Sequence, residues 1–351
     1  MTISPTLLIG SNPVDPTRRT VRSRRIQWRS ALLMLLASLA LTGVAMAESR
    51  ITYKSAKTGT SYYQMGIEIA QAMKNGSNGA MIVTVEESQG SVQNVMEAAR
   101  RGSDTGGSNF VFTTPPALVG AAQQASGPFK DKVSPEMAAK FASIRALFPL
   151  PSLTMHFVMR AGLGGTDLDA LAGRTILLGK GSFGATEGEK YLKTFGLFDK
   201  VKLANAELSN AVAALKNGQI DGFVTAGSWP APNVLEAAAG TGITLLSMSD
   251  AQIEASQQTR LVIPAGTYAG QAHDVNTTSL PVVAYTTTDM ADDTAYALVK
   301  TFWAERERMA DSAPWWRGVS LDMLATIQGP IHSGALRFYR EAGASLSDRH
   351  Q

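Results

Sequence analysis

From residue 51 onward, short apolar runs alternate with stripes of apolar residues at helical spacing. Ile51-Thr52-Tyr53 predicts a short strand. Ile69 and Met73 lie on one face of a predicted helix, which ends at Asn75-Gly76. The same order of strand, polar loop and helix returns in residues 81–99, 175–195 and 201–218, and again from residue 220. This alternation predicts an α/β fold with a mostly parallel sheet.

Two long extended runs, residues 153–160 and 277–287, enclose the middle of the chain. Pro149-Leu150-Pro151 precedes the first run and is expected to mark the point where its strand begins. The two runs predict a second lobe inserted into the first. We expect residues 48–155 to form the first part of lobe 1, residues 156–275 to form lobe 2, and residues 276–351 to return to lobe 1 and end in C-terminal helices.

The formal net charge of +3 originates at the beginning of the chain. Six arginines between residues 18 and 29 precede an uncharged apolar run at 31–44 and then Ala45-Met46-Ala47. This pattern predicts an export signal in residues 1–47, cleaved after Ala47, and a periplasmic location. A membrane anchor is the alternative, but the run is shorter than the roughly 20 residues of a span. The pair Arg24-Arg25 leaves both general secretory and twin-arginine export open.

Removing residues 1–47 changes the electrostatics of the chain. These residues hold six basic side chains and one acidic side chain, so 26 basic and 28 acidic residues remain. No basic stretch is left, which argues against binding to nucleic acid.

The absence of cysteine and the scatter of the four histidines narrow the possible chemistry. Without cysteine there is no disulfide framework, no cysteine-based zinc site and no thiol nucleophile. His156, His273, His332 and His350 show no metal-binding spacing. His156 lies in an apolar run and is expected to be a buried core residue. We therefore expect no metal and no cofactor.

Turns rich in Gly, Ser and Thr precede predicted helices at residues 59–63, 88–91, 179–184 and 227–230. Helix N-termini carry unpaired N–H groups and a partial positive charge, and in α/β folds they meet strand ends at the ligand-binding edge. Ordinary helix capping is the alternative explanation for any single turn. Taken together, the turns predict capture of a carboxylate by backbone N–H groups and hydroxyls near Gly181, Ser182, Ala185 and Thr186.

The turn Gly179-Lys180-Gly181-Ser182-Phe183-Gly184 also matches the G-x-G-x-x-G pattern of dinucleotide sites. Its position in mid-chain, the lysine within the turn and the predicted export all argue against this interpretation. Lys180 also breaks the G-x-S-x-G pattern of a serine hydrolase around Ser182. An enzyme that binds a nucleotide or phosphorylated substrate through residues 179–184 stays as an alternative.

Short motifs along the whole chain beyond residue 47 resemble the TAXI family, the solute-binding subunits of tripartite ATP-independent periplasmic (TRAP) transporters. The matching segments are Gly59-Thr60-Ser61-Tyr62-Tyr63, Gln89-Gly90-Ser91-Val92-Gln93-Asn94, Leu168-Asp169-Ala170-Leu171-Ala172-Gly173-Arg174, residues 179–187, Leu215-Lys216-Asn217-Gly218-Gln219-Ile220-Asp221, residues 263–271 and residues 331–339.

This resemblance implies a two-lobed periplasmic binding protein of the second structural type, with a ligand cleft between lobes joined by a hinge. Such a protein has no catalytic activity and closes on its ligand by hinge motion. The resemblance implies delivery of a small organic anion, such as an amino acid, a dicarboxylate or a 2-oxo acid, to TRAP membrane permease subunits. An orphan sensory receptor that binds the same solute is the alternative.

The resemblance also places candidate ligand-binding residues in both lobes and in a third wall at 227–230. They are Gly59, Thr60, Ser61, Tyr62, Tyr63, Ser91, Ser108, Asn109, Gly181, Ser182, Phe183, Gly184, Ala185, Thr186, Ser228, Trp229 and Pro230. The chain departs from the family pattern at residues 104–110, where Gly106 and Gly107 replace the apolar strand expected after the second helix.

Overall fold

The computed structural model describes residues 48–101, 109–180 and 182–351. The predicted export signal, residues 1–47, lies outside the described residues. So do the candidate ligand-binding residues Ser108 and Gly181 and the departure at Gly106 and Gly107. Residues 48–351 form one unit by their internal contacts. Within the described ranges, no helix is long and apolar enough to cross a membrane.

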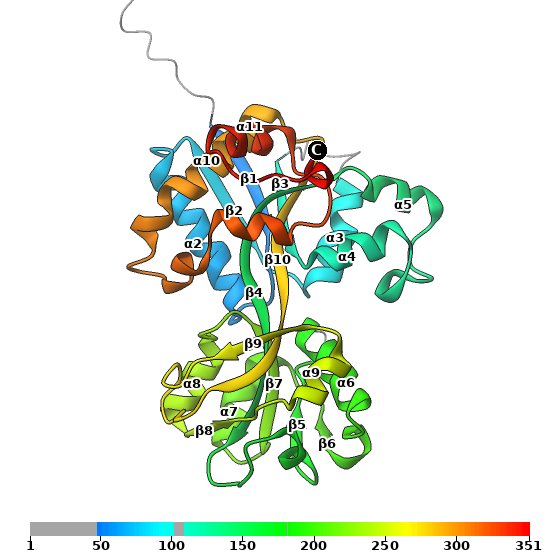
Figure 1. The fold of residues 1–351 in the computed structure, drawn as a ribbon, viewed down its shortest axis with the longest axis vertical. Coiled ribbons are helices and arrows are strands. Elements are labelled where there is room, and N and C mark those ends of the chain that lie inside the picture. Colours follow the sequence, from blue (N-terminus) through cyan, green and yellow to red (C-terminus); the bar gives the residue numbers. More distant parts are fainter. Residues whose placement is uncertain (1–47, 102–108, 181) are drawn as a thin grey trace, which may run out of the picture. The chain divides into compact units, whose positions relative to one another are not determined.

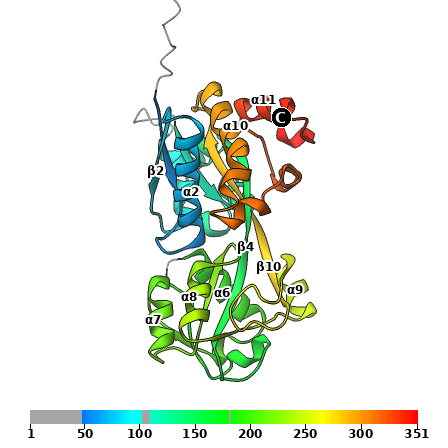
Figure 2. The same ribbon diagram turned by 90° about the vertical axis from the view of Figure 1, so that its left-hand side faces the viewer.

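Two long strands, β4 (Ile144–Arg160) and β10 (Val275–Thr287), lie at the centre of the fold. They pair antiparallel over most of their length, and both run from one lobe into the other, as Figure 1 and Figure 2 show. The described strands form a single ten-stranded sheet, in which β4 and β10 are neighbours. These strands correspond to the two extended runs of the sequence, and the proposed lobe boundaries fall inside β4 and at the start of β10.

Pro149 and Pro151 lie inside β4, so the expectation that they precede the strand is wrong. The pairing of β4 with β7 (Gly222–Gly227) covers only residues 154–159 of β4. The two prolines therefore lie in a part of β4 that pairs with β10 on one side and lacks β7 on the other. A proline has no N–H to donate, and a one-sided position of this kind tolerates it. The register between β10 and β4 shifts at Leu280/Val282, on either side of Pro281.

Lobe 1 contains the first strands and the C-terminal helices. Its strands β1 (Ser49–Lys54), β2 (Met81–Glu86) and β3 (Phe110–Thr114) are parallel to one another and join β10 through β3. Helices lie on both faces of this sheet (Figure 1). On one face are α2 (Ser61–Gly76), α10 (Asp292–Met309) and α11 (Ser333–Glu341), and on the other α3 (Ser91–Arg101), α4 (Pro116–Gln123) and α5 (Pro135–Phe141). A single apolar core includes Phe148 stacked on Phe302, with ring centroids 4.0 Å apart.

Lobe 2 is built on the remaining strands, β5 (Thr175–Leu177), β6 (Lys202–Ala204), β7, β8 (Ile243–Leu245) and β9 (Thr259–Ile263). Its helices are α6 (Phe183–Thr194), α7 (Ala211–Lys216), α8 (Pro232–Gly240) and α9 (Asp250–Ser256). Successive residues of β4 face two separate apolar cores: Phe157 and Met159 belong to one, and Val158 to the other. The alternation is the two-residue period of a strand that is covered on both faces.

The expectation of a mostly parallel sheet is wrong for the sheet as a whole. Four pairings among the described strands are parallel, and these join β1 to β2 and β3, and β5 to β6 and β7. Every pairing made by β4 or β10 is antiparallel. Each lobe thus has a parallel layer, and the two crossing strands connect the layers.

Candidate functional site

A cavity of about 60 Å³ lies between the lobes, at the carboxyl ends of the parallel strands. It is lined from lobe 1 by Ser55, Ala56, Lys57, Thr60, Tyr62, Gln89, Gly90, Ser91, Thr113, Thr114 and Pro115, from the crossing strands by Leu153 and Val282, and from lobe 2 by Ser182, Phe183, Gly184, Leu208 and Ala226. Six of the candidate residues are in this lining: Thr60, Tyr62, Ser91, Ser182, Phe183 and Gly184. We call it the inner cavity.

Helix α6 begins at the inner cavity because Ser182 caps it. The Ser182 Oγ accepts a hydrogen bond from the Ala185 N–H at 3.0 Å and donates one to the Gly179 carbonyl at 2.8 Å. The first N–H groups of a helix have no acceptor within the helix. In α6 these groups belong to Phe183 and Gly184, both of which line the inner cavity.

The start of α3 faces the start of α6 across the inner cavity. Gly90, just before α3, has a φ of +114°, a conformation that favours glycine. A Cβ atom added to Gly90 would lie 3.9 Å from the Phe183 backbone nitrogen of the opposite lobe. Two helix N-termini, each with roughly half a positive charge, therefore converge on one small space. This arrangement attracts an anion.

The third strand of lobe 1 ends at the inner cavity, and the candidate residue Asn109 lies at its opposite end. β3 begins at Phe110, so Asn109 lies at the amino end of the strand, where its carbonyl accepts the Thr52 N–H. Thr113 and Thr114, at the carboxyl end, line the inner cavity instead. The α4 helix that follows begins with Pro115-Pro116. Because proline has no N–H, α4 offers an anion fewer donors than α3 or α6 does.

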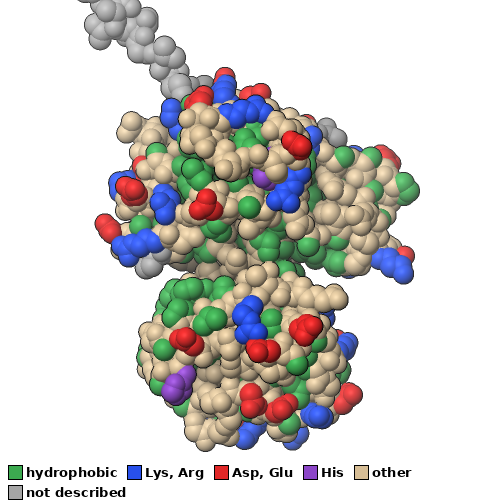
Figure 3. Space-filling model, in the orientation of Figure 1, with side chains coloured by type: hydrophobic (Ala, Val, Ile, Leu, Met, Phe, Trp, Pro, Cys, Tyr) green, Lys and Arg blue, Asp and Glu red, His purple; other side chains and the backbone are tan. Residues whose placement is uncertain are grey.

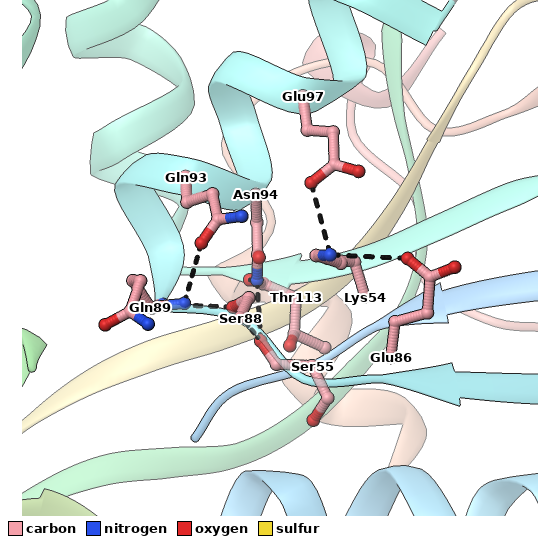
Figure 4. Close-up of polar contacts among 10 residues, drawn as sticks. Lys54, Ser55, Glu86, Ser88, Gln89, Gln93, Asn94, Glu97 and Thr113 are labelled. Carbon is pink, nitrogen blue, oxygen red and sulfur yellow. Dashed lines mark hydrogen bonds and ion pairs between the residues drawn. The ribbon is translucent and has the colours of Figure 1, made fainter. Parts of the chain in front are cut away.

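A polar network holds the strand ends of lobe 1 in register (Figure 4). Asn94 of α3 is buried, and its Nδ2 donates to the Ser55 carbonyl at 2.8 Å and to the Thr113 carbonyl at 3.0 Å. The Ser88 hydroxyl donates to the same Ser55 carbonyl at 3.0 Å and accepts the Gly90 N–H at 2.9 Å. The network ties β1, β3 and the loop before α3 together, and so fixes one wall of the inner cavity.

Lys54, at the end of β1, extends this network to two carboxylates. Its Nζ lies 3.3 Å from Glu86 and 3.4 Å from Glu97, and its side chain is largely buried (Figure 4). Burying an ammonium away from water is energetically unfavourable, and here the two carboxylates compensate for this desolvation by pairing with it. Lys54 does not line the inner cavity.

Several hydrogen bonds join the two lobes at the rim of the inner cavity. The Lys57 Nζ from lobe 1 pairs with the Glu207 carboxylate of lobe 2 and donates to the Lys180 carbonyl at 3.1 Å. The Ser228 N–H donates to the Ser61 Oγ at 3.0 Å, and both residues are buried. These contacts describe a state in which the lobes meet over the cavity.

An outer groove of about 570 Å³ adjoins the inner cavity. The two share Lys57, Thr60, Gln89 and Leu208 in their linings. The outer groove is lined further by Thr58, Gly59, Glu87, Glu207, Ser209, Val212, Pro232, Asn233 and Glu236. The inner cavity is smaller than the roughly 300–1,000 Å³ of a typical ligand site. A ligand of more than a few atoms therefore extends into the outer groove or enters while the lobes are apart.

Besides Asn109, eight candidate residues of the described chain do not line the inner cavity, namely Gly59, Ser61, Tyr63, Ala185, Thr186, Ser228, Trp229 and Pro230. Gly59 lines the outer groove, and Ala185 and Thr186 line a separate groove on lobe 2. Trp229 packs against a lobe 2 core. Ser61 and Ser228 bond to each other, and Tyr63 and Pro230 are not part of the lining.

Tyr62 lines the inner cavity, but its hydroxyl is engaged elsewhere. It donates to the Pro151 carbonyl of β4 at 2.6 Å, and burial raises the pKa of this phenol well above its usual value. Tyr62 therefore connects the start of α2 to a crossing strand, and its ring forms the wall.

Several lining residues escaped the sequence analysis. Gln89 is the first residue of the quoted motif at 89–94 and Lys57 lies two residues before the motif at 59–63, and a polar residue in the loop after a predicted strand was the signal available for each. Thr113-Thr114-Pro115 follows the apolar run Phe110-Val111-Phe112, which is itself a strand signal. Leu153 and Val282 come from crossing strands, and no local pattern indicates that they face a cavity.

His156 has the structural role expected from the sequence. It is buried in β4, its Nε2 lies 2.9 Å from the Tyr268 hydroxyl and its Nδ1 lies 3.1 Å from the Thr154 carbonyl. Burial lowers the pKa of this imidazole to about 4. The Thr154 carbonyl can only accept, so Nδ1 carries the proton and Nε2 accepts a hydrogen bond from the Tyr268 hydroxyl, which itself accepts the Ala231 N–H at 2.8 Å. Among the described residues, no three His, Cys, Asp or Glu side chains cluster to hold a metal ion.

The chain matches the model of the NMT1-like family over residues 54–343. Its fold is similar to that of the periplasmic binding protein BugD, with a TM-score of 0.50 at 10% identity over 85% of this chain and 99% of that one. A structure described as a periplasmic transporter is also similar, with a TM-score of 0.50 at 12% identity over 84% of this chain and 93% of that one. These likenesses identify the fold as that of a two-lobed periplasmic binding protein.

Proposed function

Because this chain belongs to the NMT1-like family and has the fold of a periplasmic binding protein, we propose that it is an extracytoplasmic solute receptor. It captures a small organic anion, such as an amino acid, a dicarboxylate or a 2-oxo acid, and has no catalytic activity. One observation carries the proposal: the starts of α3 and α6, from different lobes, face each other across the inner cavity.

The capture mechanism follows from this geometry. A carboxylate in the inner cavity accepts hydrogen bonds from the first N–H groups of α6 at Phe183 and Gly184 and of α3 at Ser91. Thr113 and Thr114 line the same cavity and limit its size on the lobe 1 side. Ligand contacts to both lobes stabilise the closed state more than the open one, so binding shifts the population toward closure about the crossing strands.

The membrane partner proposed from the TAXI resemblance is a TRAP permease. The motifs at residues 59–63, 89–94 and 331–339 support this assignment. The proposal includes export, in which residues 1–47 act as a signal that is cleaved after Ala47 and the protein is released into the periplasm. A sensory receptor would bind the same solute and pass it to a signalling protein instead. Uptake of labelled ligand by cells that lack this gene separates the two, because only a transport receptor is needed for uptake.

An enzyme acting on a nucleotide is disfavoured by the residues that line the inner cavity. Ser182 of the 179–184 turn does cap a helix at the inner cavity, but a helix start of this kind serves equally well to bind a small carboxylate. No lining residue of the inner cavity is a histidine or an acid.

Thermal-shift screening followed by calorimetry tests the proposal. The panel contains organic anions, their neutral amide counterparts, and NADH and nucleotides. An anion at a hundred times its dissociation constant should stabilise the protein by about 2.7 kcal/mol. Stabilisation by nucleotides alone, or by no organic anion in the panel, would contradict the proposal.

A further inference from the structure

The outer groove carries a charge pattern different from that of the inner cavity. Among the described residues that line it, Glu87, Glu207 and Glu236 are acidic and Lys57 is basic. On the face shown in Figure 3, charged side chains are spread over the outer surfaces of both lobes and are sparse where the strands cross between them. The charges that line the outer groove have a negative balance.

Lys57 does not offset this balance for an incoming anion. Among the described residues that line the inner cavity, Lys57 alone is charged, and its side chain is only 14% exposed. Its ammonium already pairs with Glu207 and donates to the Lys180 carbonyl. An anion that binds beside Lys57 thus meets a neutral pair, and the attraction for a carboxylate comes from the starts of α3 and α6.

The shape of the site determines where a second charge would lie. A first carboxylate held at the α3 and α6 starts fills much of the small inner cavity, so the rest of the ligand extends past Lys57 and Glu207. A second carboxylate would then lie beside the Lys57–Glu207 pair, where Glu207 already engages the Lys57 ammonium and leaves the second carboxylate without a countercharge. Like charges placed together at a binding site oppose binding strongly.

We propose that Glu207 makes this site selective for ligands with a single carboxylate, and that it discriminates against dicarboxylates. The ligand class is a small monocarboxylate or an amino acid with an uncharged side chain. This inference rests on the proposed function of the same cleft and narrows its range of ligands. Glu207 is 50% exposed, so solvent weakens its repulsion and the discrimination is of moderate size.

The test uses pairs of probes that match in size and differ in charge: succinamate with succinate, and glutamine with glutamate. Dissociation constants are measured by calorimetry at neutral pH for the purified wild-type protein and for Glu207→Gln. In the wild type, the member with one carboxylate should bind more tightly. Glu207→Gln should improve binding of the second member by roughly five- to tenfold and bring the ratio within a pair close to one.

Glu236→Gln is the matched control, since it removes the same charge from the same groove at a residue that does not pair with Lys57. It should change the ratio less than twofold. A wild type that prefers the dicarboxylate, an unchanged ratio in Glu207→Gln, or an equal effect in Glu236→Gln would each overturn the role of Glu207. Failure of all probes and other organic anions to bind the wild type would instead refute the proposed function, and this inference with it.

Discussion

Gly227 lies where β7 of lobe 2 meets the start of α2 in lobe 1, and its replacement by alanine tests whether closure between the lobes supports binding. A Cβ atom at this position would lie 2.4 Å from the Ser61 Oγ and 3.7 Å from the Ser61 Cβ. The hydroxyl must therefore rotate away, whereas the backbone of α2 can stay. Rotation breaks the hydrogen bond from the Ser228 N–H to the Ser61 Oγ.

The size of the effect follows from the burial of this hydrogen bond. Both serines are buried when the lobes meet, so the Ser228 N–H loses its partner without gaining water. An unsatisfied buried donor costs about 1–3 kcal/mol. The cost falls on the closed state alone, so ligand affinity should drop by a factor of about 5–150. The apolar cores of the two lobes do not change, and the melting temperature should stay within a few degrees of the wild type.

The assay combines calorimetry with a distance measurement. The dissociation constant is measured with an organic anion that stabilises the wild type. The chain has no cysteine, so cysteines introduced at the exposed Lys74 and Lys216, one in each lobe, are the only sites for spin labels. Pulsed electron resonance should show a larger fraction of long distances in Gly227→Ala than in the wild type.

Ser61→Ala provides the matched control, because it removes the atom that the new methyl group would meet. Ser61→Ala, Gly227→Ala and the double variant all lose the same hydrogen bond, so their affinities should agree within about twofold. Wild-type affinity in Gly227→Ala, or additive losses in the double variant, would refute the reasoning.

Three further predictions concern lobe 2. Burial lowers the pKa of His156 to about 4 from an ordinary value of 6.5. The contribution of this neutral imidazole to the free energy of unfolding is therefore complete above pH 6.5 and falls by about 3 kcal/mol as the pH drops toward 4. Chemical denaturation across this range measures the decline, and His156→Gln should flatten it. Ser182→Ala removes the cap of α6 and should cost about 1 kcal/mol in the same denaturation assay. Gly184→Ala places a Cβ 2.8 Å from the Ala226 backbone nitrogen and should destabilise the protein. Alanine in place of glycine normally stabilises a helix by up to about 1 kcal/mol, so a stabilised variant would contradict the close packing at this position.

The alternation of strands and helices could be predicted from the sequence because each unit buries its own apolar stripe. The final α-helix, α11 (Ser333–Glu341), agrees with the expectation that the chain ends in C-terminal helices. The orientation of β4 and β10 could not be predicted in the same way. It depends on which strands each one pairs with, and those partners are distant in the chain.

The candidate site was predictable where a local signal and the topology coincide. Ser91, Ser182, Phe183 and Gly184 stand at helix starts, and all line the inner cavity. Ser228 also lies in a turn that precedes a helix, but its N–H donates a hydrogen bond to Ser61 of the other lobe and not to the inner cavity. Whether such a residue lines the inner cavity or bonds to the opposite lobe depends on how the two lobes contact each other. The sequence pattern of a helix start contains no information about that contact.

The central claim is that an organic anion binds between the starts of α3 and α6. The most direct measurement is an amide nitrogen–hydrogen correlation spectrum of the isotope-labelled protein, recorded during titration with a stabilising anion. The largest shifts should occur at the amides of Ser91, Phe183 and Gly184. Shifts confined to the separate lobe 2 groove, at Lys190 and Leu203, with these three amides unmoved, would contradict the account.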